Sequence, residues 1–166
     1  MSDLKDLMLS RPRLTLAVAE SVTCGRLQAR IGADSGASEY FLGGLTAYSL
    51  EQKVRHLGVD RAGAEGVNSV SAGVAEQMAR GACALFGADL GAATTGYAEA
   101  YPALAVAEPF AWWGLARRRP EGGFDVRSGR VACPGLSRTA VQERVADAAL
   151  GALVGWLREP AAARRT

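Results

Sequence analysis

At 166 residues, with 49% apolar and 22% charged residues, the chain is long enough for one domain with a sizeable core. It contains no apolar run near the ~20 residues that a membrane span needs and no signal-peptide pattern, so we expect a cytoplasmic protein with no membrane partner. A net charge of +2 is too small to indicate nucleic-acid binding, and the arginines at 117–119 and 164–165 are expected at the solvated surface. Three widely spaced cysteines fit a reducing compartment better than a disulfide framework.

Hydrophobic periodicity and turn residues predict helices that alternate with strands. In chain order, the predicted elements are a helix at about 2–10, a strand at 14–19, a helix at 23–33, a strand at 41–49, a helix at 51–57, a loop at 59–69, a helix from its cap Ser71 to Gly87, a strand at 89–95, a strand pair at 110–116 and 124–132, and a helix from the capping box Thr139–Gln142 to Arg158. This order implies an α/β fold, a three-layer α/β/α sandwich on a mixed sheet. We expect a single domain over 1–166, with its core at about 14–158 and a flexible tail at 159–166.

His56 is the only histidine in the chain, which excludes a histidine-rich metal site. Its position shortly before Gly58 is typical of the last turn of a surface helix, so a serine–histidine–aspartate triad is not expected either. The glycine-rich dinucleotide motif, the Walker loop and the hydrolase nucleophile elbow are also missing. We therefore predict no metal site and no cofactor.

The most informative stretch is Ala19–Gly25, which follows the first predicted strand and precedes a helix. Such a corner presents backbone N–H groups and hydroxyls to a ligand at the carboxyl end of a strand. Ser21 there is a helix cap, a phosphate ligand or a nucleophile, and its position alone does not decide among these roles. Two other strand ends carry hydroxyls, at Tyr48–Ser49 and at Thr94–Thr95, and convergence of all three would form a pocket.

A serine nucleophile needs a base. Because His56 is expected at the surface, a desolvated Lys53 is the available candidate, since burial lowers the pKa of a lysine and frees its lone pair. Tyr48 would then relay a proton or orient the lysine. The structural alternatives are a helix-capping serine, a tyrosine of the core and a solvated lysine.

Two groups of residues match a known family pattern. The segment Ala19–Gly25 is similar to an Ala-Glu-Ser-Cys-Thr-Gly-Gly signature, and a second series comprises Gly36-Ala37-Ser38, Phe41, Gly43-Gly44, Ala47-Tyr48-Ser49, Lys53 and Leu57-Gly58-Val59. These residues resemble the C-terminal domain of the CinA family, the competence- and damage-inducible proteins whose stand-alone members include nicotinamide mononucleotide deamidases. The resemblance extends over about 14–158 and implies the family's α/β/α fold, without its separate N-terminal domain.

The resemblance also implies a function. The chain would be an amidohydrolase in which Ser21 attacks the carboxamide of nicotinamide mononucleotide or a related pyridine nucleotide. Lys53 and Tyr48 would transfer the protons, and ammonia would leave. The substrate and its phosphate would be bound by Thr23, Gly25, Thr95, Gly96 and Arg138.

Departures from the family pattern are concentrated on one side of the predicted pocket. Cys24 replaces a glycine, and residues 97–102 and 108–113 replace a glycine-rich loop and the strand start that follows it with aromatic and acidic residues. A phosphate would be repelled if Glu99 or Glu108 faced the pocket; otherwise these glutamates point to water. The alternative function is a CinA-like paralogue without hydrolytic activity, which binds a small ligand or another protein.

The adjacent tryptophans Trp112 and Trp113 indicate a further contact. A pair of exposed indoles is costly in a monomer, so at least one is predicted to cover the core or to join a subunit interface. We therefore expect a homo-oligomer.

Overall fold

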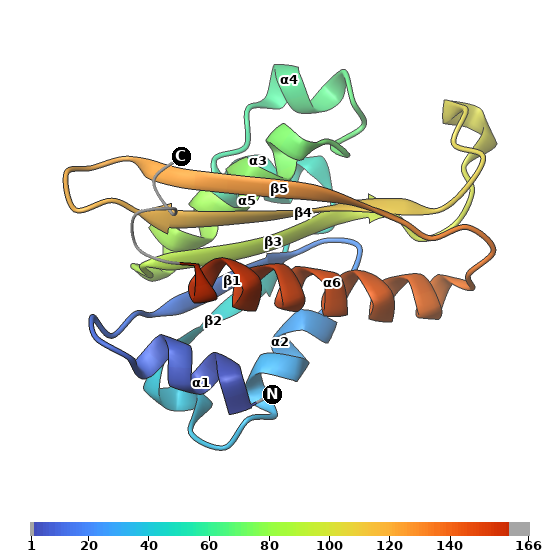
Figure 1. The fold of residues 1–166 in the computed structure, drawn as a ribbon. Helices are drawn as coiled ribbons and strands as arrows, with labels where there is room; N and C mark the ends of the chain where they lie inside the picture. The colour runs from blue at the N-terminus through green and yellow to red at the C-terminus, as the bar shows by residue number, and fades with distance from the viewer. Residues whose placement is uncertain (1, 160–166) are drawn as a thin grey trace.

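The computed structural model describes residues 2–159, which form a five-stranded mixed sheet with helices on both faces (Figure 1). The strands are β1 (Leu16–Glu20), β2 (Phe41–Thr46), β3 (Leu90–Tyr97), β4 (Phe110–Arg118) and β5 (Phe124–Ala132), in the order β2-β1-β3-β4-β5. Strand β1 pairs in parallel with β2 and β3, whereas β4 is antiparallel to both of its neighbours. The predicted sandwich on a mixed sheet is confirmed. The predicted tail lies, apart from Glu159, outside the described residues.

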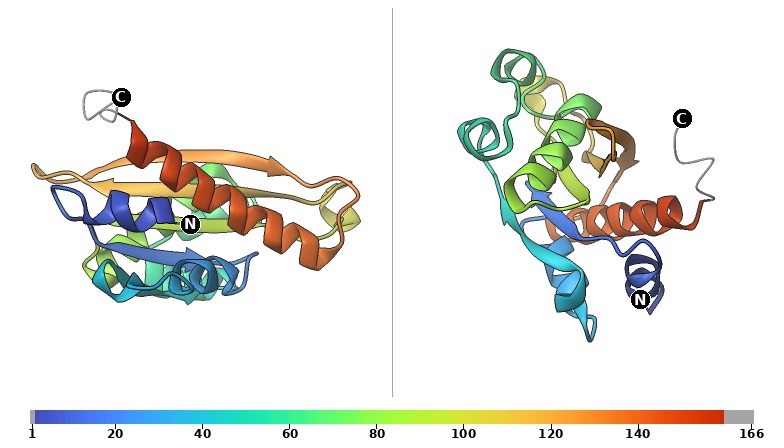
Figure 2. Two further views of the ribbon diagram at one scale, coloured as in Figure 1. Left: turned by 60° about the horizontal axis from the view of Figure 1, so that its bottom comes forward. Right: turned by 90° about the vertical axis from the view of Figure 1, so that its left-hand side faces the viewer.

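The helices form two layers, one on each side of the sheet (Figure 2). One layer contains α1 (Ser2–Leu9), α2 (Arg26–Gly32) and α6 (Arg138–Arg158), and the other contains α3 (Leu50–Leu57), α4 (Arg61–Glu65) and α5 (Ala72–Phe86). No helix within residues 2–159 combines the length and the apolar character needed to cross a membrane.

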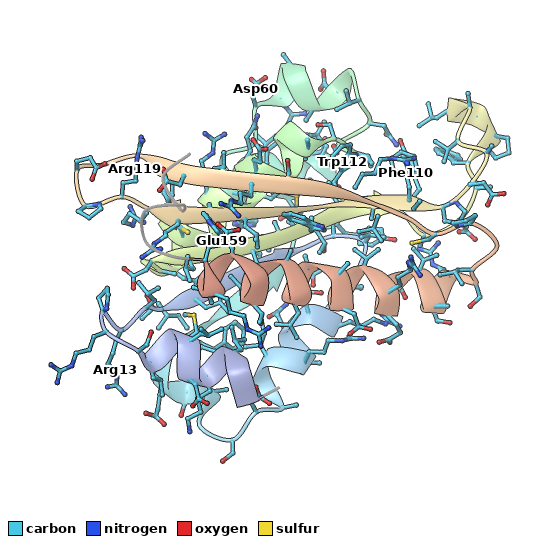
Figure 3. All side chains as sticks on the ribbon, viewed as in Figure 1. Arg13, Asp60, Phe110, Trp112, Arg119 and Glu159 are labelled. Atoms are coloured by element: carbon cyan, nitrogen blue, oxygen red, sulfur yellow. The ribbon has the colours of Figure 1, made fainter. Side chains whose placement is uncertain are left out.

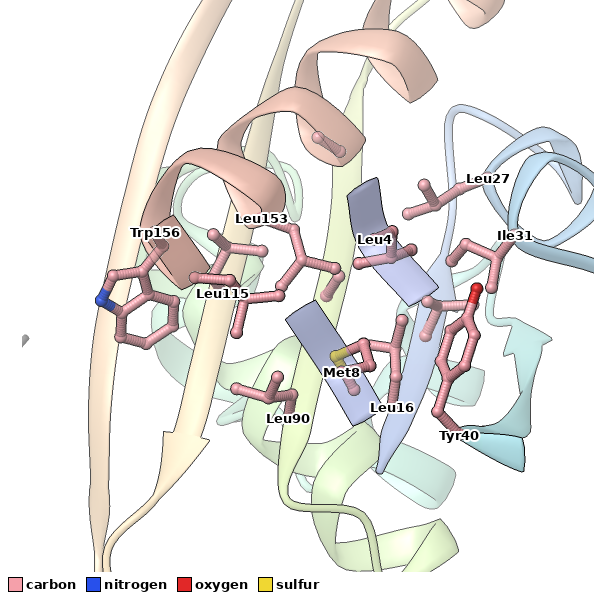
Figure 4. Close-up of a cluster of buried hydrophobic side chains, with 14 of the residues drawn as sticks. Leu4, Met8, Leu16, Leu27, Ile31, Tyr40, Leu90, Leu115, Leu153 and Trp156 are labelled. Carbon is pink, nitrogen blue, oxygen red and sulfur yellow. The ribbon is translucent and has the colours of Figure 1, made fainter. Parts of the chain in front are cut away.

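Strand β1 is buried along its whole length because helices cover both of its faces. Leu16 and Val18 pack into the cluster beneath α1, α2 and α6, which Figure 4 shows, while Ala17 and Ala19 face the cluster beneath α5. The strand period of two thus divides one apolar run between two cores. Strand β1 lies between β2 and the central strand β3, and its last residues are buried between the two helix layers.

Several predicted boundaries are wrong by a short distance. Residues 61–65 of the predicted loop form α4, because the Asp60 carboxylate accepts a hydrogen bond from Gly63 N (2.7 Å) and caps this helix. The cap of α6 is Ser137, whose Oγ accepts from Ala140 N (3.4 Å), and not Thr139. His56 lies exposed in the last turn of α3 as predicted, and Trp113 packs against the core.

The close approach of β3 to α5 leads to a prediction about stability. A Cβ at Gly91 would lie 2.0 Å from the carbonyl oxygen of Ala79, a backbone atom that cannot move without shifting the helix. We expect Gly91→Ala to lower the free energy of unfolding by more than about 2 kcal/mol in urea denaturation. Gly151→Ala is the matched control, because a Cβ in this turn of α6 meets nothing within 4 Å. Helix propensity should then raise stability by about 1 kcal/mol, and equal stability of the two variants would contradict the prediction.

Candidate functional site

A pocket of about 540 Å³ lies at the carboxyl ends of β1, β2 and β3, where ligands bind in sheets of this type. It brings together most of the residues predicted for the site: Ser21, Tyr48, Lys53, Thr95, Gly96 and Arg138. Thr23 and Gly25 are not among the lining residues. The predicted convergence of three strand ends is therefore confirmed, because residues at the ends of β1, β2 and β3 all line this pocket.

Ser21 is not a helix cap. Helix α2 begins at Arg26 with Gly25 in the cap position, and the backbone N–H of Ser21 donates to the carbonyl of Thr94 (3.0 Å). The side chain is only 6% exposed, yet its Oγ makes no hydrogen bond to any residue that the structure describes. A pocket-lining hydroxyl without a structural partner is available for chemistry.

The capping task belongs to Glu20, which is fully buried. Its Oε2 accepts hydrogen bonds from Gly25 N (3.0 Å) and Leu27 N (3.1 Å), and Oε1 accepts from Gln28 N (2.8 Å). The protein's own carboxylate thus occupies the anion position that a strand-to-helix corner offers. A substrate phosphate has no place at this helix end.

Lys53 is the buried cation of the pocket. It is 3% exposed, and burial lowers the pKa of its ammonium group from 10.5 to about 8. Among the residues that the structure describes, none accepts a hydrogen bond from Nζ or forms an ion pair with it. A substantial neutral fraction near physiological pH makes this lysine fit to accept a proton.

The depressed pKa of Lys53 has a consequence for stability. Between pH 8 and pH 10.5 the unfolded chain holds a proton on this lysine that the folded chain has lost, so wild-type stability rises with pH in that window. We expect Lys53→Met to stabilise the protein at pH 7 by on the order of 3 kcal/mol, and the gain to shrink towards pH 10.5. Urea denaturation at pH 7 and pH 10 measures this difference. Lys5→Met, at a partly exposed lysine, is the control and should not gain stability at pH 7; a loss of stability in Lys53→Met at pH 7 would contradict the prediction.

Tyr48 is bonded to Arg138 and not to Lys53. Arg138 Nη2 donates to the tyrosine hydroxyl (2.9 Å), and Arg138 Nη1 is paired with the carboxylate of Glu99. No hydrogen bond joins Lys53 to Tyr48 in the part of the chain that the structure describes. Because Arg138 is the donor, the proton of the Tyr48 hydroxyl remains free, and with 56% of this side chain exposed it faces the open side of the pocket.

Three residues predicted to bind the substrate have their donors engaged elsewhere. The hydroxyl of Thr23 donates to the Glu20 carboxylate (2.5 Å), and the N–H of Gly25 has the same acceptor. The hydroxyl of Thr95 donates to the carbonyl of Ser69 (2.7 Å). Since a hydroxyl has one proton to donate, none of these groups offers a hydrogen bond to a phosphate.

Asn68 and Ser69 form a wall of the pocket that was not predicted from the sequence. Both residues line the pocket and adopt left-handed backbone conformations, with φ of 48° and 59°. Asn68 Nδ2 donates to the hydroxyl of Tyr97 (3.1 Å), which ties this wall to the end of β3. The one signal available was the residue type, because asparagine tolerates this conformation better than most residues. Strained backbone of this kind is concentrated at functional sites.

Known proteins of similar sequence and structure identify the family of this chain. The model of the CinA C-terminal domain matches residues 2–157. The chain belongs to the CinA C-terminal domain family. Within the CinA family, it is similar to the CinA-like protein of Chlorobaculum tepidum (40% identity over 157 residues, covering 93% of this chain and 36% of the relative). It is also similar to the CinA-like protein of Chlorobium limicola (35% identity over 160 residues, 92% of this chain and 35% of the relative). The chain thus spans about a third of the length of these relatives.

Solved CinA structures have the same fold. The competence damage-inducible protein A of Klebsiella pneumoniae superposes with a TM-score of 0.80 at 27% identity, covering 93% of this chain and 92% of that one. A CinA superfamily protein of Enterobacter cloacae gives a TM-score of 0.83 at 26% identity, covering 94% and 89%. The predicted family and its fold are therefore confirmed.

Cys24 stands where the CinA signature has a glycine, and the backbone conformation at this position favours glycine. Cys24 has φ of 50°, and Gly25 follows with φ of 93°. Two successive left-handed residues turn the chain from β1 into α2, a conformation that glycine adopts without steric cost. The Cys24 side chain is exposed and is not among the pocket's lining residues, so the replacement leaves the pocket open.

Proposed function

We propose that this chain is an amidohydrolase that converts the carboxamide of nicotinamide mononucleotide, or of a related pyridine compound, to the acid and ammonia. One observation carries the proposal: the buried, unpaired Lys53 lines the same pocket as the unbonded hydroxyl of Ser21. A perturbed lysine and a free hydroxyl in one pocket are the components of a serine–lysine nucleophile.

The reaction follows from these two groups. Neutral Lys53 takes the proton of Ser21 as the serine oxygen bonds to the amide carbon. The ammonium group of Lys53 then returns a proton to the amide nitrogen, the C–N bond breaks, and ammonia leaves. Water attacks the resulting ester with Lys53 again as the base, which releases the acid and restores Ser21. The hydroxyl proton of Tyr48, which is not used in its bond with Arg138, assists departure of the nitrogen.

A second candidate is a CinA-like protein that binds a small ligand without hydrolysing it. The observation in its favour is that Arg138 is already engaged by Glu99 and by Tyr48, so a cation and a proton donor of the predicted site are bonded to each other. Turnover of any pyridine carboxamide would exclude this candidate.

Ammonia release decides between the two functions. The wild-type protein should release ammonia from at least one pyridine carboxamide, and Ser21→Ala should not, while keeping its thermal unfolding midpoint. Mass spectrometry of an acid-quenched reaction should detect the acyl group on the wild-type chain only. Full activity in Ser21→Ala would refute the nucleophile assignment, and no release from any pyridine carboxamide would refute hydrolysis.

A further inference from the structure

The charges that line the pocket are balanced, which bears on the substrate. Two of its lining residues are cationic, Lys53 and Arg138, and two are anionic, Glu65 and Glu99. Lys53 is buried, whereas the Glu99 side chain is 67% exposed at the open side of the pocket. A ligand that enters therefore meets a carboxylate at the entrance and the lysine at depth.

Arg138, the lining cation near the entrance, already has an anionic partner. Arg138 is held by the carboxylate of Glu99 and by the hydroxyl of Tyr48 (2.9 Å). Glu99 belongs to the segment 98–109, which follows β3 and projects beyond the sheet in Figure 1. A phosphate at Arg138 would have to displace Glu99 and then remain beside its negative charge.

Three of the other groups predicted to bind the substrate do not compensate. The hydroxyl of Thr23 and the N–H of Gly25 are bound to Glu20, and the hydroxyl of Thr95 is bound to the Ser69 carbonyl. None of these three groups can therefore contribute to a cradle of free N–H and O–H groups of the kind that phosphates need.

The same side of the pocket is well suited to a positively charged aromatic ring. Tyr97 and Tyr101 both line it, with ring centroids 6.3 Å apart. Phe110, labelled at the start of β4 in Figure 3, supports the Tyr97 ring edge-on at 5.4 Å. Aromatic faces attract cations, and the carboxylates of Glu65 and Glu99 also line the pocket.

These features match one chemical class. A pyridine carboxamide joined through its ring nitrogen to ribose carries a fixed positive charge on the ring. A 5′-phosphate adds nearly two negative charges at pH 7. The first compound complements the tyrosines and carboxylates, whereas the second adds negative charge to a pocket that already contains Glu65 and Glu99.

We propose that Glu99, through its ion pair with Arg138, is the specificity-determining residue that makes this pocket select a phosphate-free, cationic pyridine carboxamide nucleoside over its 5′-phosphorylated counterpart. The proposal rests on the amidohydrolase function given above and narrows its substrate class. Glu99 and Arg138 line the same pocket as Ser21 and Lys53, and the selection requires no group that the chain lacks.

Binding is the test, because it separates selection from catalysis. The probes are nicotinamide riboside and nicotinamide mononucleotide, which differ only in the phosphate, titrated into the Ser21→Ala protein by calorimetry. We expect the riboside to bind about tenfold more tightly, since one close like-charge contact in partly solvated surroundings has about this effect. Adding Glu99→Gln should improve binding of the mononucleotide about tenfold and leave the riboside unchanged or slightly weaker.

Two further variants make the result specific. Glu108→Gln removes a carboxylate from the same segment that does not line the pocket and accepts a hydrogen bond from Gly135 N (3.3 Å), so it should leave the binding ratio unchanged. Arg138→Gln combined with Glu99→Gln should lose the improved mononucleotide binding, because that gain depends on the released guanidinium group.

The outcomes distinguish the two proposals. Equal or tighter binding of the mononucleotide, an unchanged ratio in Glu99→Gln, or no binding of either compound would overturn the selectivity. Riboside-selective binding that shifts with Glu99→Gln, together with no ammonia release by the wild type, would leave the selectivity standing and refute hydrolysis alone.

Discussion

Ser21→Ala and Lys53→Met are each expected to lower kcat for ammonia release by about 1,000-fold or more, and the double variant should be no slower than the slower single one. The reason is that the two side chains perform one step. Without Lys53 the serine proton has no acceptor, and without Ser21 the lysine has nothing to activate. Steady-state ammonia release by the three variants and the wild type measures this coupling. Additive losses in the double variant would show that the two residues act independently.

The pH dependence of kcat/KM in the wild type is an independent test of the same pair, Ser21 and Lys53. The base must be neutral, and the pKa of Lys53 is lowered to about 8 by burial, so kcat/KM should rise with pH and level off above about pH 8. Lys5→Met, which replaces a lysine outside the pocket, should keep both the rate and the profile. A flat profile between pH 6 and pH 9 would remove Lys53 as the base.

Lys53→Met also separates catalysis from folding. This variant is expected to be more stable than the wild type at pH 7 and yet inactive. A merely structural lysine would give the opposite result, with lower stability and activity lost only in proportion to unfolding. Residues that are kept for function at the expense of stability are common at active sites.

Glu20→Ala is expected to destabilise the protein by about 4–6 kcal/mol, a large share of the stability of a typical domain. The buried carboxylate accepts from the N–H groups of Gly25, Leu27 and Gln28, and from the hydroxyl of Thr23. Alanine would leave all of these donors buried or partly buried without an acceptor, at a cost of about 1–3 kcal/mol for each fully buried group. Urea denaturation followed by circular dichroism measures the loss.

Two control variants show whether the loss of stability is specific to the buried carboxylate. Glu20→Gln keeps the shape and one acceptor oxygen but presents an NH₂ group to the N–H donors, so its loss of stability should be intermediate. Glu39→Ala removes an exposed glutamate that pairs with Lys5 and Arg13, and should cost less than about 1 kcal/mol. A loss in Glu20→Ala as small as that in Glu39→Ala would show that the corner does not depend on this carboxylate.

The corner at Glu20–Ser21 illustrates how far sequence reasoning reaches. The strand-to-helix turn and the family signature were predictable from residue types and spacing, and the expected burial of Lys53 is confirmed. The same pattern suggested that Thr23 and Gly25 hold the substrate, yet both serve Glu20. A glutamate that ends an apolar strand before a helix start was the available signal for this capping role.

The partner of Arg138 could not be predicted either. The sequence shows Glu99 in a loop that differs from the family pattern, and leaves open whether its side chain faces the pocket or the solvent. Arg138 lies 39 residues further along the chain. Only the packing of the segment after β3 against the start of α6 brings the two together. Glu108, in the same segment, does not line the pocket.

By itself, the sequence determined the fold, the family and the residues proposed as nucleophile and base, because periodicity and short motifs are local properties of the chain. The tertiary structure decided which donors remain free. In the sequence, Thr23, Gly25 and Thr95 look as available to a ligand as Ser21. Their donors are instead bonded to Glu20 or Ser69, and an N–H or hydroxyl proton used in one hydrogen bond is lost to another. The burial of Lys53 and the pairing of Arg138 with Glu99 are likewise set by contacts between distant segments.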